Sequence, residues 1–275
     1  MTIINYRMSL IGIHLDDMGD MMGPLYDHVD HFQIFVDPMV DYPEKYPDQL
    51  QYIRRNRIMI VVHSSYTVNI SKKWSADDWW VELVLREIEQ AHIIGGYCLV
   101  IHTGKSIDLD RSVAINNMYS FLLHINRSTV DRFGEVKLLI ETPSGRGTEL
   151  LYDLDDYLNF MKKLLNISDR FGCCIDSCHL FSSGIDLRKK ENIDHMFGRL
   201  NRTIGMGAIK LCHLNDSKDG LGEKKDRHQT IGRGMIGMDG ITLIAIFLKN
   251  IGIPIILETP RHNIFDDLRL IRSLG

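Results

Sequence analysis

The sequence lacks an apolar run long enough to cross a membrane. A membrane-spanning helix needs about 20 consecutive apolar residues, and residues 1–10 lack the charged start, apolar middle and small-residue cleavage site of a signal peptide. Cysteines are also few, five in 275 residues, and they show no paired CxxC spacing, so we expect neither a disulfide framework nor a zinc finger. These absences favour an intracellular protein of the cytoplasm or the nucleus, or of the virion if the source is a virus.

The sequence also has no excess of positive charge. Its 32 Lys and Arg residues stand against 36 Asp and Glu residues, which gives a net charge of −4 at pH 7. Such a balance argues against a protein that coats nucleic acid by bulk charge, although a protein that binds cations first remains compatible with it. The composition is otherwise typical of a globular domain, with 44% hydrophobic and 25% charged residues.

Short apolar runs rich in Ile, Val and Leu recur along the whole chain. The eight runs cover residues 9–14, 32–36, 58–63, 97–102, 137–141, 172–176, 209–213 and 254–258. Continuous apolar runs of about five residues are typical of parallel strands that are covered on both faces, whereas antiparallel strands would show alternation. We therefore expect eight parallel strands.

Segments with a helical period lie between these runs. Ser75 is the expected cap of a helix that stops at Gly95, and further helices are predicted over residues 110–133, 153–171 and 238–251. Strands that alternate with helices in this way predict an α/β fold, a single (β/α)8 TIM barrel over residues 1–275. The connection over residues 214–237 has no apolar period, and a loop of that length is usually functional.

Potential metal ligands occur at the ends of six of the eight predicted strands. They are His63, His102, Glu141, Asp176, His213 and Glu258. The carboxyl ends of the strands of a TIM barrel converge on one face, where barrels of this kind carry their active sites. A single such residue is usually a helix cap or a buried polar group, but six in succession predict a shared site.

Three more potential ligands lie beyond strand ends: His179, Asp226 and His228. Histidine nitrogens mixed with carboxylate oxygens favour zinc or manganese over calcium or magnesium. Nine side chains suit a cluster of two or three ions, because a single tetrahedral ion needs only three or four. Such a cluster would add positive charge and favour an anionic substrate such as a phosphate.

Several blocks of the sequence resemble the endonuclease IV family of apurinic/apyrimidinic (AP) endonucleases. The blocks are CIDSCH at 174–179 continuing to SGIDLR at 183–188, HLND at 213–216, DRH at 226–228, GRGMIG at 232–237 and HSSY at 63–66. The resemblance runs from IGIH at 11–14 to ILET at 256–259. Any one block is weak, but the set in this order is specific for the family.

The resemblance implies a centre of three zinc ions, with Mn²⁺ as the alternative ion. His63, His102 and Glu141 would hold the first ion. Glu141 would bridge to a second ion held by Asp176, His213 and Glu258, and His179, Asp226 and His228 would hold the third. All nine positions carry the residue type that the family uses.

The resemblance further implies hydrolysis of the phosphodiester 5′ to an abasic site in duplex DNA, as in base excision repair. The products would be a 3′-hydroxyl and a 5′-deoxyribose phosphate, and trimming of 3′ ends is a further expected activity. Glu141, which bridges two ions, and Glu258, which could orient the attacking water, are the expected catalytic carboxylates. We expect a monomer that binds DNA and no membrane.

Contacts with DNA are predicted at six residues near strand ends: Tyr66, Lys105, Arg146, Lys218, Arg227 and Arg233. Tyr66 matches a family tyrosine that enters the minor groove, and the cations are candidates for phosphate contacts. The sequence departs from the family over residues 36–43, which contain no arginine, and at Thr67, where a larger apolar residue is common.

A sugar isomerase or epimerase with a single metal ion is the main alternative, because such enzymes share the barrel with ligands at its strand ends. Glu141, Asp176, His213 and Glu258 would suffice for that chemistry. The alternative leaves the other five predicted ligands without a purpose, so the number of bound ions separates the two hypotheses. A metal-stabilised binding protein is less favoured, since a barrel of eight apolar strands needs no structural zinc.

Overall fold

Eight parallel strands form a closed barrel in the computed structural model, which describes residues 11–22, 26 and 29–274. The strands are β1 (Ile11–Leu15), β2 (His31–Phe35), β3 (Met59–His63), β4 (Gly96–Ile101), β5 (Lys137–Glu141), β6 (Phe171–Asp176), β7 (Ile209–His213) and β10 (Ile255–Leu257). Each pairs with its sequence neighbours, and the ring closes where β1 lies beside β10, with Ile11 opposite Ile255. The predicted (β/α)8 TIM barrel is therefore confirmed.

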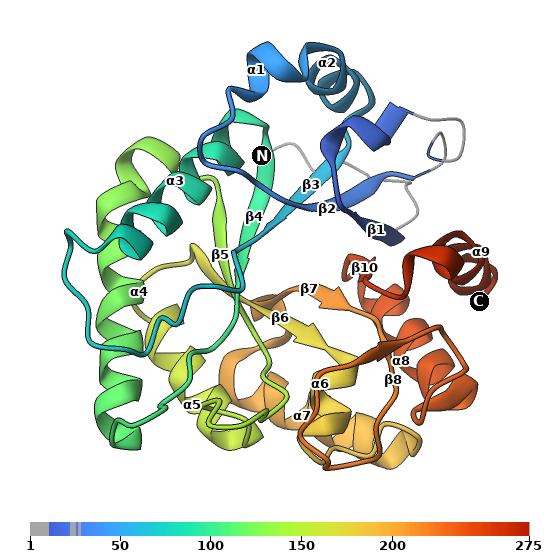
Figure 1. Ribbon diagram of the computed structural model, residues 1–275. Coiled ribbons are helices and arrows are strands. Elements are labelled where there is room, and N and C mark those ends of the chain that lie inside the picture. The colour runs from blue at the N-terminus through green and yellow to red at the C-terminus, as the bar shows by residue number, and fades with distance from the viewer. Residues whose placement is uncertain (1–10, 23–25, 27–28, 275) are drawn as a thin grey trace.

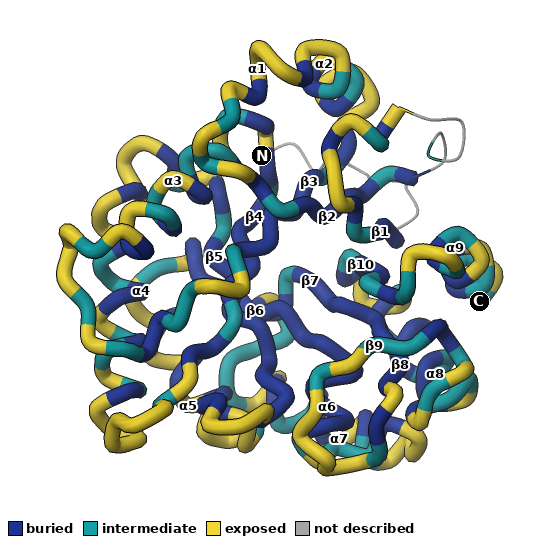
Figure 2. Tube along the Cα trace, viewed as in Figure 1, coloured by how far each residue is buried: buried dark blue, intermediate teal, exposed yellow. Residues whose placement is uncertain are grey.

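Helices surround the barrel, as Figure 1 shows. They are α1 (Tyr42–Lys45), α2 (Pro47–Asn56), α3 (Trp79–Ile93), α4 (Arg111–Phe133), α5 (Leu154–Leu165), α6 (Ser177–Ser182), α7 (Lys190–Ile204), α8 (Gly237–Ile251) and α9 (Ile264–Ser273), with short 3₁₀ turns η1 (Met18–Met22), η2 (Met206–Ala208) and η3 (Arg261–Asn263). Figure 2 shows that the strands are buried and that exposed residues lie on the outer faces of the helices. Within the described part of the chain, no helix combines the length and the apolar character that a membrane crossing requires.

The predicted strand bounds differ from the observed ones by at most one residue at either end, except at the first strand, where residues 9 and 10 lie outside the described residues. The predicted extent of a single domain to residue 1 likewise lies partly outside them. The loop over residues 214–237 contains a two-stranded antiparallel sheet, β8 (Asp216–Ser217) and β9 (His228–Gln229).

Two predictions about helix ends were wrong. Ser75 does not cap α3; Asp78 is the N-cap residue, and its carboxylate accepts a hydrogen bond from the Ser75 backbone N–H at 2.9 Å. Helix α5 ends at Leu165 rather than at residue 171, because its apolar stripe stops there and Ile167 is exposed. Phe171 instead begins β6, where it is completely buried.

The interior of the barrel is a separate apolar cluster. It consists of Val61, Cys98, Val100, Leu139, Cys174, Leu211 and Ile256, all completely buried. Successive side chains of a strand point to opposite faces, so the residue two positions further along points the same way. Six of the predicted ligands occupy that position: His63 after Val61, and in the same manner His102, Glu141, Asp176, His213 and Glu258. They form the layer above the apolar interior.

Candidate metal centre

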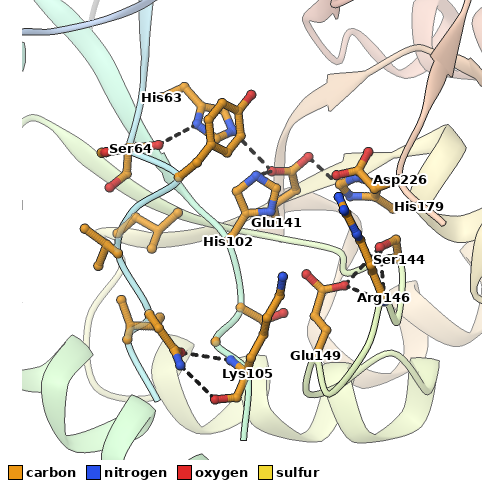
Figure 3. A pocket seen from close by; sticks show the side chains of 18 of the residues that line it. His63, Ser64, His102, Lys105, Glu141, Ser144, Arg146, Glu149, His179 and Asp226 are labelled. Atoms are coloured by element: carbon orange, nitrogen blue, oxygen red, sulfur yellow. Dashed lines mark hydrogen bonds and ion pairs between the residues drawn. The ribbon is translucent and has the colours of Figure 1, made fainter. Parts of the chain in front are cut away.

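The nine predicted ligands come together at the carboxyl ends of the strands, in three groups. Within each group the candidate ligand atoms lie within 4.8 Å of one another: His63, His102 and Glu141; Glu141, Asp176, His213 and Glu258; and His179, Asp226 and His228. These are the three sets that the family resemblance implies, and Glu141 belongs to two of them. Figure 3 shows side chains of the first and third sets facing one another across Glu141.

Glu141 occupies the middle of the site. Its Oε2 lies 3.4 Å from Nε2 of His63 and 3.5 Å from Nε2 of His102. Its Oε1 lies 2.9 Å from Nδ1 of His213 and 3.5 Å from Nδ1 of His179. The carboxylate is buried, and its Oε2 makes no hydrogen bond. An ionised oxygen of this kind is costly unless a cation compensates it.

Three of the histidines direct Nδ1 at a backbone carbonyl. The partners are Ser64 O for His63 (2.8 Å), Thr142 O for His179 (2.8 Å) and Glu258 O for His228 (3.3 Å). A carbonyl only accepts, so Nδ1 must carry the hydrogen and Nε2 is left as the ligand atom. The Nε2 atoms of His179 and His228 are buried without a hydrogen-bond partner. Imidazoles held in this way are typical of metal sites.

Opposite charges shift the pKa values of the site. Burial favours the neutral form of Glu258, yet His213 and His228 lower the pKa of this carboxylate to about 2. Burial also opposes the charged form of His213, but Glu258 and Glu141 raise its pKa to about 9. Burial raises the pKa of Asp176 and lowers that of His102 to about 4. The donor set of imidazoles and carboxylates fits divalent cations such as zinc or manganese.

Seven of the nine predicted ligands, all except Asp176 and His213, line a cavity of about 620 Å³. Of the residues predicted to contact DNA, Tyr66, Lys105 and Arg146 also line it. Tyr66 is exposed, and its ring lies 5.3 Å from that of His63 and 5.7 Å from that of His102. The site therefore opens onto a wall that carries two cations and an aromatic ring.

The other three predicted DNA contacts lie outside this lining. Arg227 is paired with Asp219, with Nε 2.7 Å from Oδ2. Lys218 follows β8, and its backbone N–H donates to Arg227 O at 3.0 Å. Arg233 lies in the turn before α8. These three cations are near predicted ligands in the sequence, but the structure does not bring them into the cavity with Lys105 and Arg146.

Polar side chains that the sequence interpretation missed hold the loops that carry the cavity cations. Asn69 accepts from the Lys105 backbone N–H and donates to its carbonyl, both at 2.9 Å. Glu149 accepts from the Arg146 backbone N–H at 3.2 Å. Glu87 of α3 accepts from the Ser65 backbone N–H at 2.9 Å, next to Tyr66. Only Glu87 gave a signal in the sequence, as a carboxylate within the buried stripe of a predicted helix.

Two missed amides contact the ligands themselves. Asn215 donates from Nδ2 to Asp176 Oδ2 at 2.7 Å and to Glu258 Oε2 at 3.1 Å. Gln33 of β2 lies 2.8 Å from Nε2 of His213 through its Oε1. The available signals were the place of Asn215 in the HLND block and the presence of a glutamine inside an apolar strand.

Comparisons with known proteins agree with this geometry. Residues 26–274 match the model of the xylose isomerase-like TIM barrel family. The "Probable endonuclease 4" of Malacoplasma penetrans is 31% identical over 88% of this chain and 86% of the relative. Endonuclease IV from Thermus thermophilus shares the fold, with a TM-score of 0.76 at 24% identity over 96% of this chain and 98% of that one.

A D-tagatose 3-epimerase-like protein also shares the fold, with a TM-score of 0.73 at 18% identity over 96% of each chain. At such identities the two structural matches describe the fold alone, whereas the similarity to the curated relative extends through the sequence. The chain therefore belongs to the endonuclease IV family of AP endonucleases, within the xylose isomerase-like TIM barrels.

Proposed function

We propose that this chain, as a DNA-hydrolysing member of its family, is a zinc-dependent AP endonuclease of base excision repair. It cuts the phosphodiester 5′ to an abasic site in duplex DNA and leaves a 3′-hydroxyl and a 5′-deoxyribose phosphate. The observation that carries the proposal is the set of three adjoining ligand groups, two of which share Glu141. A nuclease that handles one phosphate with several cations needs such a set.

Each group would hold one zinc ion, three in all, with Mn²⁺ as a substitute. Bound zinc would supply Lewis acidity and lower the pKa of coordinated water towards neutrality. The histidines supply lone pairs, since backbone carbonyls keep a hydrogen on Nδ1 of His63, His179 and His228. Glu141 links the first two groups, which makes it the residue on which the spacing of the ions depends.

Glu258 is the second proposed catalytic carboxylate. It lies one residue beyond β10 and lines the cavity, while Asn215 holds one of its oxygens and Gln33 the other. A carboxylate fixed at both oxygens can orient an attacking water at a constant angle. Its lowered pKa keeps it ionised at neutral pH.

The cavity wall suits a damaged nucleic acid. Lys105 and Arg146 line the cavity and would contact phosphates of the bound strand, and the exposed ring of Tyr66 would enter the space left by a missing base. Lys218, Arg227 and Arg233 would contact the duplex beyond the cavity. We expect the protein to act as a monomer and also to trim blocked 3′ ends.

Incision of a labelled duplex that carries one abasic-site analogue tests the proposal. We expect a single cut 5′ to the lesion on a denaturing gel, its loss after chelation and its return with zinc. A metal-replete protein that leaves the duplex intact would exclude the proposal. Binding of one ion per chain would then favour a sugar isomerase, for which Glu141, Asp176, His213 and Glu258 suffice.

Single variants test the ligand assignment. His102→Ala, Glu141→Ala and Asp226→Ala should each reduce incision about 100-fold or more, because each removes several kcal/mol of metal-dependent stabilisation. His195→Ala is the matched control, since this histidine is exposed on α7, away from the strand ends. Wild-type rates in any of the three variants, with the fold checked by circular dichroism, would remove that residue from the centre.

A further inference from the structure

Gln33 is a polar residue at a level of the barrel where the neighbouring strand β3 carries an apolar side chain. It lies in β2, level with Val61 of the apolar interior, and is completely buried. Its amide contacts His213 through Oε1 (2.8 Å) and Glu258 Oε1 through Nε2 (2.5 Å). The same Nε2 lies 3.1 Å from Nδ1 of His14. One side chain from β2 thus reaches the last residue of β7 and the residue that follows β10.

The orientation of this amide follows from its partners. An ionised carboxylate can only accept hydrogen bonds, so the NH₂ group of Gln33 must face Glu258. The carbonyl oxygen must then face His213, and it can accept only if Nε2 of His213 carries a hydrogen. The reverse orientation would place an oxygen against a carboxylate in a buried site, which is costly.

His213 therefore differs from the other histidines of the centre. His63, His179 and His228 keep a hydrogen on Nδ1, through backbone carbonyls, and present Nε2. His213 keeps a hydrogen on Nε2, through Gln33, and presents Nδ1, which lies 2.9 Å from Glu141 Oε1 and 3.3 Å from Glu258 Oε2. Only the Nδ1 side of this ring faces the carboxylates of the second group.

We infer that Gln33 is a positioning residue that fixes the tautomer of His213 and the carboxylate of Glu258 together, and so sets the ion affinity of the second group. The inference rests on the proposed function only in requiring that this group binds an ion. Partners of this kind typically change metal affinity by roughly 10- to 100-fold. The first and third groups do not contact Gln33 through a hydrogen bond among the described residues, so their ions should stay.

Ion retention under competition with a chelator is the main test. Zinc-loaded Gln33→Leu should lose one ion per chain at roughly 10- to 100-fold lower chelator concentration than wild type, with the remaining ions unchanged. For DNA incision, kcat should fall while KM stays constant. Gln90→Leu is the matched control, because among the described residues the amide of Gln90 donates only to the carbonyls of Pro38 and Val40, at 3.5 and 3.3 Å.

A second measurement needs no variant and therefore no assumption about folding. Long-range proton–nitrogen NMR spectra of zinc-loaded wild-type protein with ¹⁵N-histidine should show the hydrogen of His213 on Nε2 and those of His63, His179 and His228 on Nδ1. Gln33→Glu, which keeps an acceptor for His213 but opposes Glu258, should also weaken retention of one ion. A hydrogen on Nδ1 of His213, or unchanged retention in both variants, would overturn the inference.

The outcomes separate this inference from the proposed function. Wild-type protein that cuts abasic DNA while Gln33→Leu keeps every ion at wild-type affinity would overturn the role of Gln33 alone. Wild-type protein that binds its ions but does not cut DNA would overturn the proposed function. Ion retention in the Gln33 variants would still test the positioning role of Gln33. A wild-type chain that binds no divalent ion would overturn both.

Discussion

Protons and metal ions compete for the same nitrogen atoms at the residue scale. Without ions, the neighbouring carboxylates hold protons on His213 and His228, whose pKa values are raised to about 9 although burial opposes this. Histidine binds metals only when a ring nitrogen is free of hydrogen. Ion uptake below pH 9 must therefore displace these protons.

We predict that zinc affinity rises with pH between about 6.5 and 8, by about tenfold per unit for each proton displaced. The sign follows from the raised pKa values: the competing protons are fully bound below about 9 and leave as the pH approaches that value. Calorimetry in buffers of different ionisation enthalpy would measure the released protons. An affinity independent of pH over this range would contradict the assignment of both histidines.

The residues that sequence interpretation could and could not find differ in a physical way. Predicted ligands such as His63 and Asp176 lie at strand ends, where period and residue type together indicate the role. Gln33 and Asn215 contact residues that are far away in the sequence. Gln33, for example, donates a hydrogen bond to Glu258, which is 225 positions further along the chain. No local pattern encodes such a partner, so the contacts of these two amides with the predicted ligands became visible only in the folded chain.

At the element scale, the loop after β7 has no apolar period and is stabilised by hydrogen bonds to a buried carboxylate. Asp216 is completely buried and accepts backbone hydrogen bonds from Ser217, Gly234 and Ile236 at 2.8, 2.9 and 3.0 Å. The backbone passes so close that a Cβ at Gly234 would lie 2.4 Å from Asp216 Oδ1. The Asp216 carboxylate thus stabilises the turn of the GRGMIG segment that leads into α8.

We predict that Asp216→Ala lowers the free energy of unfolding by about 2–3 kcal/mol, because several buried N–H groups lose their acceptor at once. The turn that carries Arg233 should lose protection from hydrogen exchange. Asp266→Ala, which breaks an exposed ion pair with Arg269, should change stability by less than about 1 kcal/mol. Chemical denaturation would measure both, and equal losses would contradict the role of Asp216.

Element boundaries were less predictable than element types. The apolar runs located the strands because a strand buried on both faces has few alternatives. Helix α5 ended early because a helix stops where its buried stripe stops, and Phe171 belongs by burial to the following strand. The β8–β9 pair has no apolar signal at all, since it is stabilised by backbone contacts within a polar loop.

The balance of charge is a property of the whole molecule. The chain has a net charge of −4, and four of its carboxylates converge at the mouth of the barrel. Without ions this mouth would repel a DNA phosphate, whereas three divalent ions would reverse the sign of the charge there. The metal centre would then contribute to attracting DNA as well as to cutting it.

We predict that chelation weakens binding of an undamaged duplex by about tenfold at an ionic strength of about 0.1 M. Fluorescence anisotropy with a labelled duplex would measure the change, and added zinc should restore the affinity. Unchanged or tighter binding after chelation would show that the cations of the loops alone carry the interaction.

Closure of the barrel has a consequence for biosynthesis. The last strand, β10, pairs with both β1 and β7, and Glu258 follows it directly. Because a ribosome delivers the chain from its amino end, the seven earlier strands emerge before the strand that closes the ring. Chains that stop before β10 consequently lack both the closing strand and Glu258, a carboxylate of the second ligand group. The barrel and this group are therefore completed by the same late segment of the chain.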